Sequence, residues 1–218
     1  MIKGVISDMD GVILDSEKLY VRFWCEAAQS LGYPMQPQHA LGIRSLGRPF
    51  AIKKLCGWFG EDFDYDAVRN RRIELMDTHV TQYGIEAKEG ARETLCAIKN
   101  AGLPIALATA TPVERAEKYL DAVGLLGFFD KIVSARMVKN GKPAPDIYLF
   151  AAKQLGLAPG DCLALEDSQN GIRSAAAAGC RAVLVPDLDN PEKELDGLLY
   201  AVAGKLTDVI DLIDKENR

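Results

Sequence analysis

The sequence contains no long apolar run and few of the residues that bind transition metals. Its 218 residues include two histidines and five cysteines, and no two cysteines form a C-x-x-C pair. An odd, dispersed set of cysteines favours reduced core thiols over a disulfide framework or a zinc site. No stretch approaches the roughly 18 apolar residues of a membrane span, and no charged segment followed by an apolar one opens the chain. We therefore expect a cytoplasmic protein with no membrane partner.

Positive charge is also scarce. Acidic residues outnumber basic ones by 31 to 26, the net charge is −5, and the basic residues form no long run. Such a surface does not attract nucleic acid or an anionic membrane over a broad area. We therefore expect no nucleic-acid partner, and any anionic ligand must be held locally. The length allows one large domain or one domain with a smaller insert.

Apolar spacing in the first part of the chain predicts one strand followed by helices. Val5 and Ile6 form a short β-branched run that predicts a buried strand. No strand is indicated from Ser16 to Tyr83. The pattern there predicts helices at 16–32, about 49–59 and about 65–83, with a loop around a short helix at 33–47. Asp15 or Ser16 is expected to cap the first of these helices.

After Gly84, helices and strands alternate, which is typical of a parallel sheet covered on both faces. Helices are predicted at 90–101, 113–123, 145–155, 170–178 and 206–213, and strands at 104–108, 131–134, 162–165 and 182–185. The predicted fold is therefore α/β, a doubly wound (Rossmann-like) parallel sheet with an inserted all-helical domain. The α/β core comprises residues 1–15 and 84–218, and the helical insert comprises residues 16–83.

Two carboxylates follow the first predicted strand. Asp8 and Asp10 are two residues apart, so both leave an extended chain on the same side while Met9 turns into the core. Gly11 then allows a sharp turn. Doubly wound sheets bind ligands beyond the carboxyl ends of their strands, so this position favours a reaction centre. An Asp-x-Asp-Gly sequence by itself is more often a solvated turn.

Three further strands of the predicted sheet are followed by polar residues. The segments that contain them are Thr109-Ala110-Thr111 after 104–108, Gly141-Lys142-Pro143 after 131–134, and Glu166-Asp167-Ser168 after 162–165. Singly, Lys142 would be a solvated loop lysine and Thr109 a helix cap. Together they place carboxylates, hydroxyls and a lysine at one end of one sheet, where hydroxyls and helix amides can hold a phosphate oxygen.

The acidic residues at this edge predict a hard cation. Mg²⁺ is usually held by one or two carboxylates together with water and a substrate phosphate. A carboxylate that attacks a phosphate approaches like charge, and at about 3 Å with an effective dielectric near 20 two unit charges repel by about 5 kcal/mol. A divalent ion beside Asp8 removes this repulsion, while Lys142 and Thr109 take up charge on the other oxygens. We expect Mg²⁺ as the cofactor of a phosphoryl transfer.

Four segments resemble, in order and type, the signatures of the haloacid dehalogenase-like (HAD) phosphatases, in the subfamily of β-phosphoglucomutases and sugar-phosphate phosphatases. They are DMDGV at 8–12, LATAT at 107–111, GKPAPD at 141–146 and LEDSQNG at 165–171. The resemblance covers nearly the whole chain, because the helical insert is similar to the family's small cap. Four ordered motifs are far more specific than any one of them.

The resemblance implies a role for each motif residue. Asp8 is the implied nucleophile, which forms an aspartyl-phosphate, and Asp10 is the implied acid and base. The implied ligands of Mg²⁺ are the Asp8 carboxylate, the Asp10 backbone carbonyl and Asp167, with Glu166 as a direct or indirect partner. The implied binders of the phosphoryl group are Thr109, Ala110 and Lys142. The implied activity is hydrolysis of a small phosphorylated metabolite, with a sugar phosphate as the expected substrate.

The cap is expected to supply substrate choice, because it closes over the strand ends. Its candidate residues are Arg44, Arg48, Arg71 and Arg72. The resemblance places Arg71 near the position at which the mutases have a cap lysine that contacts substrate phosphate. The alternative for each is an arginine with its head in solvent, which is the common case on a helix surface.

A mutase that returns the phosphoryl group to a sugar is the alternative activity. The mutases resembled here usually carry Thr at the position of Ser16 and His at the position of Tyr20. Asp15, Ser16 and Glu17 instead match a form associated with sugar-phosphate phosphatases. Without that histidine, hydrolysis is favoured.

Two hypotheses lie outside metabolic enzymes. A signalling receiver domain also joins an acidic cluster, a Thr and a Lys on a doubly wound sheet, but it has no helical insert and no acid at the position of Asp10. A catalytically silent binding protein is disfavoured, because no motif residue is missing. We expect a monomer or a weak homo-oligomer whose partner is the small phosphorylated metabolite.

Overall fold

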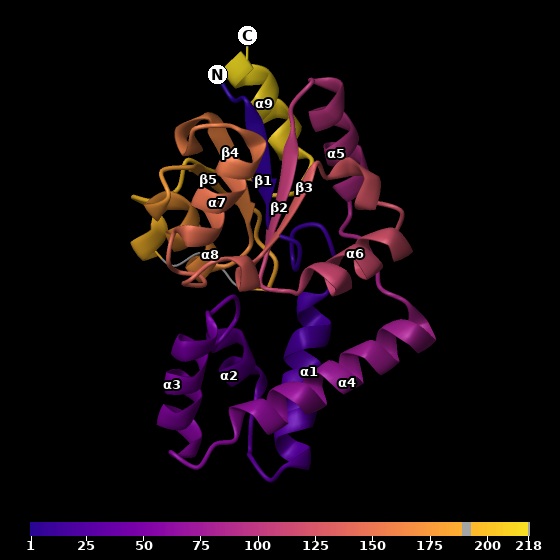
Figure 1. Ribbon diagram of the computed structural model, residues 1–218, viewed down its shortest axis with the longest axis vertical. Helices are drawn as coiled ribbons and strands as arrows, with labels where there is room; N and C mark the ends of the chain where they lie inside the picture. The colour runs from indigo at the N-terminus through magenta and orange to yellow at the C-terminus, as the bar shows by residue number, and fades with distance from the viewer. Residues whose placement is uncertain (189–192, 218) are drawn as a thin grey trace.

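The computed structural model describes residues 1–188 and 193–217 and shows a single parallel sheet in this part of the chain (Figure 1). Its strands are β1 (Gly4–Ser7), β2 (Ile105–Thr109), β3 (Lys131–Ser134), β4 (Cys162–Glu166), β5 (Arg181–Leu184) and β6 (Ala201–Val202). They are ordered β3-β2-β1-β4-β5-β6, so β1 lies at the centre between β2 and β4. The strand order reverses there, and doubly wound sheets bind ligands at this point.

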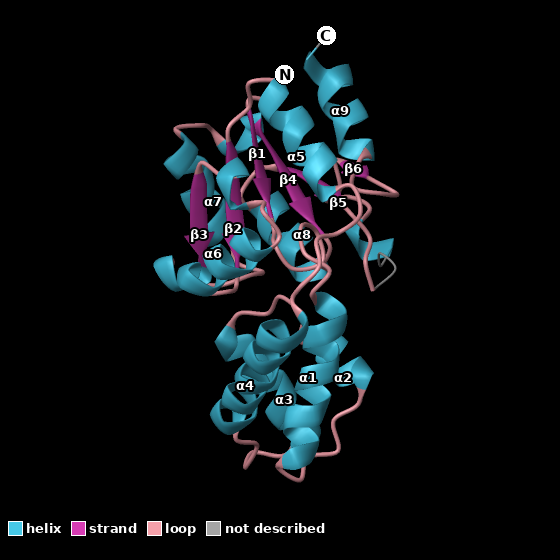
Figure 2. Ribbon diagram, turned by 90° about the vertical axis from the view of Figure 1, so that its right-hand side faces the viewer, coloured by secondary structure: helices cyan, strands magenta, loops and turns pink. Residues whose placement is uncertain are grey.

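Helices cover both faces of the sheet (Figure 2). On one face they are α5 (Ala91–Asn100), α6 (Val113–Ala122) and α9 (Asp208–Asn217), and on the other α7 (Asp146–Leu155) and α8 (Gln169–Ala177). Short 3₁₀ turns are η1 (Leu126–Phe128), η2 (Ala135–Met137), η3 (Pro159–Asp161) and η4 (Lys193–Leu195). Neighbouring strand residues serve opposite cores: Val5 packs on the first face and Ile6 on the second. Every residue of β1, β2 and β4 is buried, which explains their continuous apolar runs.

Four helices lie beyond the carboxyl ends of the strands and form the cap (Figure 1). They are α1 (Glu17–Ser30), α2 (Pro37–Gly42), α3 (Arg48–Phe59) and α4 (Tyr65–Tyr83). Ala27, Leu55 and Val68 belong to a separate apolar core inside the cap, while Phe23 and Met76 join the core of the sheet. The cap is therefore packed onto the sheet through α1 and α4. The domain boundaries at residues 15/16 and 83/84 stay a prediction.

The predicted α/β doubly wound fold with an inserted helical cap is confirmed. The strand β6 was not predicted, because its two residues are too few to show a periodicity. The predicted side-chain cap of α1 is wrong. Ser16 occupies the N-cap position, but its hydroxyl donates to a carboxylate oxygen of Asp10 instead of accepting from the first turn. A hydrogen bond to a buried charged acceptor is the stronger of the two.

All five cysteines are free thiols. Among the described residues, none of the helices has the length and apolar character needed to span a bilayer.

Candidate active site

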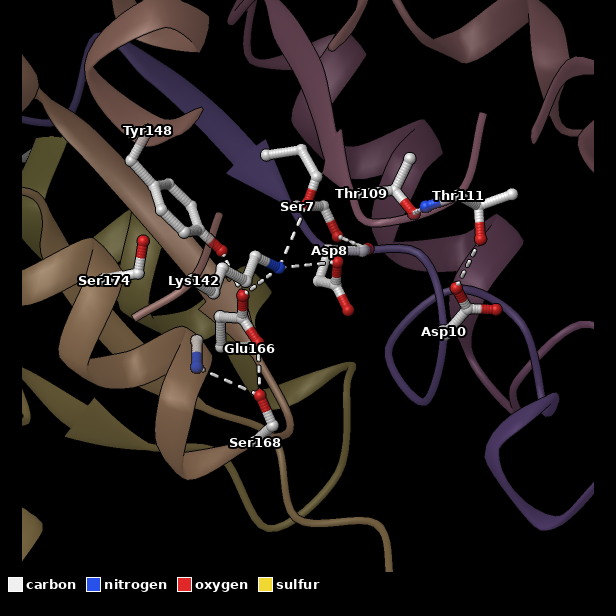
Figure 3. Close-up of polar contacts among 12 residues, drawn as sticks. Ser7, Asp8, Asp10, Thr109, Thr111, Lys142, Tyr148, Glu166, Ser168 and Ser174 are labelled. Carbon is white, nitrogen blue, oxygen red and sulfur yellow. Dashed lines mark hydrogen bonds and ion pairs between the residues drawn. The ribbon is translucent and has the colours of Figure 1, made fainter. Parts of the chain in front are cut away.

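Polar side chains from four strand ends meet at one edge of the sheet (Figure 3). Asp8 directly follows β1, Thr109 ends β2 and Glu166 ends β4, while Lys142 comes from the loop between β3 and α7. The backbone N–H of Asp8 donates to the Leu165 carbonyl at 2.9 Å, which continues the ladder between β1 and β4. All four polar side chains are buried. The sheet therefore brings together the motif residues that the sequence places far apart.

Lys142 is held beside Asp8 by three acceptors. Its Nζ lies 2.8 Å from Asp8 Oδ1, 2.5 Å from Glu166 Oε1 and 3.1 Å from the Ala108 carbonyl oxygen. Burial opposes its charge, but the attraction of Asp8 and Glu166 is larger and raises the pKa of Lys142 above its ordinary value. Lys142 is therefore a fixed positive charge at the strand ends.

Both carboxylate oxygens of Glu166 are occupied. Oε1 accepts from the Tyr148 hydroxyl at 2.5 Å as well as pairing with Lys142, and Oε2 accepts from the Ser168 hydroxyl at 3.3 Å. A Cβ atom at Gly171 would overlap this carboxylate, so only glycine fits there. These contacts leave Glu166 better placed to orient Lys142 than to bind a cation directly. Tyr148 was not among the predicted site residues, although it stands two residues after the GKPAPD motif.

Asp10 is held by two hydroxyls. Ser16 Oγ donates to its Oδ1 at 2.6 Å, and Thr111 Oγ1 donates to its Oδ2 at 3.3 Å. Burial raises the pKa of Asp10 above its ordinary value, although both hydrogen bonds act in the opposite direction. A raised pKa lets a carboxyl group hold a proton that it can later donate.

Asp167 is a buried carboxylate that has a cation, Arg44, at ion-pair distance but accepts no hydrogen bond from the described residues. Its Oδ1 and Oδ2 are both buried without a hydrogen-bond partner among the described residues. Carboxylate oxygens of Asp8, Glu166 and Asp167 lie within 4.8 Å of one another. Isolated buried carboxylates are costly unless a cation compensates them. An all-oxygen donor set without His or Cys fits Mg²⁺.

Four carboxyl groups around this edge share the effect of burial. Burial raises the pKa of Asp8 to about 7 and that of Glu17 to about 8. Burial also raises the pKa of Asp10, and it raises the pKa of Asp167 well above its ordinary value. Glu17, the first residue of α1, was not a predicted site residue; its place beside Ser16 was the available signal. When these four carboxyl groups are ionised, their negative charge exceeds the positive charge of Lys142 and Arg44.

Thr109 and Ala110 have different surroundings. Thr109 is fully buried, and its Oγ1 accepts from the backbone N–H of Thr111 at 3.0 Å. Ala110 is exposed and lines the cavity beside Asp8. The backbone of this turn therefore faces the site, and the Thr109 hydroxyl fixes its shape.

A cavity of about 410 Å³ lies between the strand ends and the cap. This volume is in the range of sites for small molecules. Its walls include Asp8, Asp10, Ala110 and Thr111 from the core, and Glu17, Tyr20, Trp24, Arg44, Arg48 and Arg72 from the cap. The cavity therefore opens onto both catalytic candidates of the first motif.

The predicted cap arginines have different surroundings. Arg44 is buried against the core: its Nη2 donates to the Asp167 carbonyl oxygen at 2.8 Å, and its Nη1 lies 3.6 Å from Asp167 Oδ2. Arg48 lines the cavity, but it is exposed and its Nη2 pairs with Asp66 Oδ2 at 2.6 Å. Both arginines are therefore at the site, with Arg44 beside Asp167.

The two adjacent candidates Arg71 and Arg72 have opposite surroundings. Arg71 is exposed, pairs with Glu74 at 3.0 Å and is not among the residues that line the cavity. Arg72 is buried and lines it. The reason is helical spacing, since Arg72 falls four residues from both Val68 and Met76 on the buried face of α4.

One cap loop touches two segments that follow strands of the sheet. The backbone N–H of Gly47 donates to the Lys142 carbonyl at 2.8 Å, and Asn170 Nδ2 donates to the Arg44 carbonyl at 3.0 Å. Gly47 and Gly141 meet backbone to backbone, and a Cβ atom on Gly141 would lie 3.0 Å from the Gly47 Cα. The two glycines allow this close approach.

The comparison with known families agrees with this geometry. Residues 2–179 match the haloacid dehalogenase-like hydrolase family. The chain belongs to this family. The predictions of the HAD family and of an enzyme are confirmed by this match.

Relatives of this HAD hydrolase include proteins with two activities. Hexitol phosphatase B of Escherichia coli (strain K12) is 31% identical over 218 residues, which cover 99% of this chain and 96% of the relative. β-Phosphoglucomutase of Bacillus subtilis (strain 168) is 28% identical over 190 residues, which cover 84% and 82%. The crystal structure of a hydrolase from Pseudomonas syringae has a TM-score of 0.86 at 23% identity, covers 98% of both chains and shows the shared fold.

Proposed function

We propose that this HAD hydrolase is a Mg²⁺-dependent phosphatase that hydrolyses a small phosphorylated metabolite, a sugar phosphate, through an aspartyl-phosphate on Asp8. The observation that carries the proposal is the pairing of Asp8 Oδ1 with Lys142 at 2.8 Å beside the buried oxygens of Asp167, which accept no hydrogen bond from the described residues. The similarity to a hexitol phosphatase over nearly the full length of both chains supports a sugar phosphate as substrate.

Asp8 and Asp10 divide the chemistry between them. A carboxylate oxygen of Asp8 attacks the phosphorus atom, and the bond from phosphorus to the leaving oxygen breaks. Asp10 donates its proton to that oxygen, and then removes a proton from the water that attacks the phosphorus of the aspartyl-phosphate. Inorganic phosphate leaves and Asp8 is restored. The two hydroxyls that hold Asp10 fix its direction for both steps.

Lys142 and the turn at Thr109 stabilise the phosphoryl oxygens. Lys142 is held by Asp8 and Glu166, so its charge needs no reorganisation during the transfer. The turn at 109–111 leads into the N-terminus of α6, whose helix dipole suits an anion.

The carboxylates of Asp8 and Asp167 and the backbone carbonyl of Asp10 would hold Mg²⁺, with Glu166 acting through Lys142. When bound, the ion supplies positive charge that reduces the repulsion between Asp8 and the phosphate. The buried oxygens of Asp167, which accept no hydrogen bond from the described residues, support this assignment.

The residue at position 20 favours hydrolysis over mutase activity. Tyr20 lines the cavity close enough to Asp10 for their charges to interact, and burial raises the pKa of its hydroxyl above the ordinary value. A phenol in that state does not replace an imidazole as a base at neutral pH. Transfer to water therefore fits the site better than transfer to a second sugar oxygen.

A phosphate-release assay tests the proposal. Purified protein with Mg²⁺ should release inorganic phosphate from p-nitrophenyl phosphate and from members of a sugar-phosphate panel, and chelation should stop the reaction. Asp8→Asn and Asp10→Asn should each lower kcat by at least about a thousandfold. Asp121→Asn, at an exposed position of α6, is the matched control and should keep the parent rate.

Two outcomes would contradict the proposal. Turnover of Asp8→Asn at the parent rate would remove the nucleophile. Phosphorus NMR that shows an isomerised sugar phosphate without free phosphate would make the protein a mutase.

A further inference from the structure

Cationic side chains gather on the part of the cavity wall that the proposed hydrolysis does not use. Arg69 and Arg72 come from α4 of the cap, Arg115 from α6 and Arg136 from η2 after β3, and all four line the cavity. The acidic residues that line the same cavity are Asp8, Asp10 and Glu17. The cavity wall therefore carries more cationic than acidic side chains.

Arg72 is built into this wall. Its guanidinium carbon lies 4.9 Å from the centre of the Tyr20 ring and 5.4 Å from that of Trp24, so two aromatic residues of α1 hold it in place. The side chain is buried, with 8% of the residue exposed. Its Nε has no hydrogen-bond partner among the residues that the structure describes. A fixed guanidinium with an unused donor is suited to bind an oxyanion.

Arg69 stands next to Arg72 in a like-charged group. It is half-buried, and burial together with repulsion from Arg72, Arg136 and Arg115 lowers the pKa of its guanidinium despite the opposing effect of Tyr65. Within the described ranges, Arg69 and Arg136 take part in no ion pair, and Arg115 pairs with Asp77 at 3.3 Å. Mutual repulsion of this kind is relieved when an anion binds between the charges.

We propose that Arg69, Arg72 and Arg136 bind a second oxyanion of the substrate, at the end of the molecule away from the phosphate that is removed. The inference rests on the proposed function and narrows its substrate class. The substrate is a phosphate ester that also carries a carboxylate or a second phosphate. Lys142 and the turn at Thr109 serve the phosphate at Asp8, so these arginines are available for another charge.

Matched substrates test the second charge directly. Sorbitol 6-phosphate, 6-phosphogluconate and fructose 1,6-bisphosphate end in a hydroxymethyl group, a carboxylate and a second phosphate, respectively. We expect kcat/KM to be at least about tenfold higher for one or both of the doubly anionic esters than for sorbitol 6-phosphate. The ester with the larger gain identifies the oxyanion. An equal or higher value for sorbitol 6-phosphate would overturn the proposal.

Two variants assign the effect to these arginines. Arg69→Gln and Arg136→Gln should each reduce the ratio of kcat/KM for the doubly anionic ester to that for sorbitol 6-phosphate by about tenfold, mainly through KM. Arg71→Gln removes an equal charge from the exposed face of α4 and should leave the ratio unchanged. An unchanged ratio in both site variants, or an equal loss in Arg71→Gln, would refute the assignment.

Binding measurements separate this proposal from the proposed function. If the protein released no phosphate from any ester, the phosphatase assignment would fail. Calorimetric titration of the same protein with 6-phosphogluconate, fructose 1,6-bisphosphate and sorbitol 6-phosphate would still test the arginines. Tighter binding of a doubly anionic ester, lost in Arg69→Gln, supports the second oxyanion site, and equal binding of all three refutes it.

Discussion

Metal-free protein should lose stability as the pH rises from 5.5 to 7.5. Burial raises the pKa of Asp8 from 3.8 to about 7 and that of Glu17 from 4.5 to about 8. In this window the folded protein holds protons that the unfolded chain has released. Stability therefore falls with rising pH until the folded-state pKa values are passed. Carboxylates with lowered pKa values, such as Asp66, lose their stabilising effect only at more acidic pH.

The size of the effect follows from the shift at Asp8. Each pH unit between its two pKa values is worth about 1.4 kcal/mol, so titration from pH 5.5 to 7 costs about 2 kcal/mol from this group alone. For a chain of this length, 1 kcal/mol corresponds to about 2–4 °C in Tm. We therefore expect a fall of about 4–8 °C from Asp8, with a further fall from Glu17.

The assay is thermal unfolding of chelator-treated protein at a series of pH values, with and without Mg²⁺. A cation bound to ionised carboxylates stabilises the fold by mass action, so Mg²⁺ should raise Tm more at pH 7.5 than at pH 5.5. Asp8→Asn, which cannot titrate at position 8, should show a shallower dependence. A metal-free Tm that is constant or rises from pH 5.5 to 7.5 would refute this account of the carboxylate cluster.

Three further predictions concern single residues. Gly171→Ala should displace the Glu166 carboxylate from Lys142, which should lower kcat and reduce the free energy of unfolding by about 2 kcal/mol or more, measured by thermal unfolding. The control is Gly57→Ala on α3, where a Cβ atom meets nothing within 4 Å, so this variant should be neutral or stabilising. Equal effects of the two substitutions would contradict the reasoning. Burial raises the thiol pKa of Cys162 to about 11 and that of Cys180 to about 12. Both thiols should therefore resist iodoacetamide at pH 8 in the folded protein, whereas the partly exposed Cys96 should react. Mass spectrometry of the labelled peptides measures the difference. Arg44→Gln removes a positive charge beside Asp167 and should tighten Mg²⁺ binding about threefold to tenfold, measured by calorimetry. The control Arg48→Gln removes a charge that is paired with Asp66 and should leave Mg²⁺ binding unchanged. Weaker binding in Arg44→Gln would contradict the prediction and show that this arginine supports the cation site.

Periodicity was enough to predict the sheet and its helices, because the strands at the centre are buried on both faces and each is followed by an amphipathic helix. It also placed Asp8, Lys142 and Glu166 at a common edge, since the carboxyl ends of parallel strands meet there. The family resemblance then gave these residues roles that the sequence pattern alone left open.

The remaining features depend on side-chain directions that local patterns do not contain. Arg71 and Arg72 are adjacent and chemically equal, and only the register of the buried face of α4 separates them. Ser16 has the sequence of a helix cap, but Asp10 lies within reach and takes its hydrogen bond. Arg44 meets Asp167 across 123 positions of the chain, a contact that no local spacing can indicate.

The backbone contact between Gly47 and Gly141 links the cap to the loop that carries Lys142. Their backbones touch where the cap loop lies against the loop that carries Lys142, and the Gly47 amide bonds to the Lys142 carbonyl. This contact joins the cap directly to the backbone of Lys142, at one of the residues proposed to bind the phosphoryl group. A methyl group on either glycine would crowd the other backbone, since a Cβ atom would lie 3.0 Å from the Gly47 Cα if placed on Gly141 and 3.3 Å from the Gly141 Cα if placed on Gly47. The fit between cap and core at this point therefore leaves room for hydrogen atoms alone.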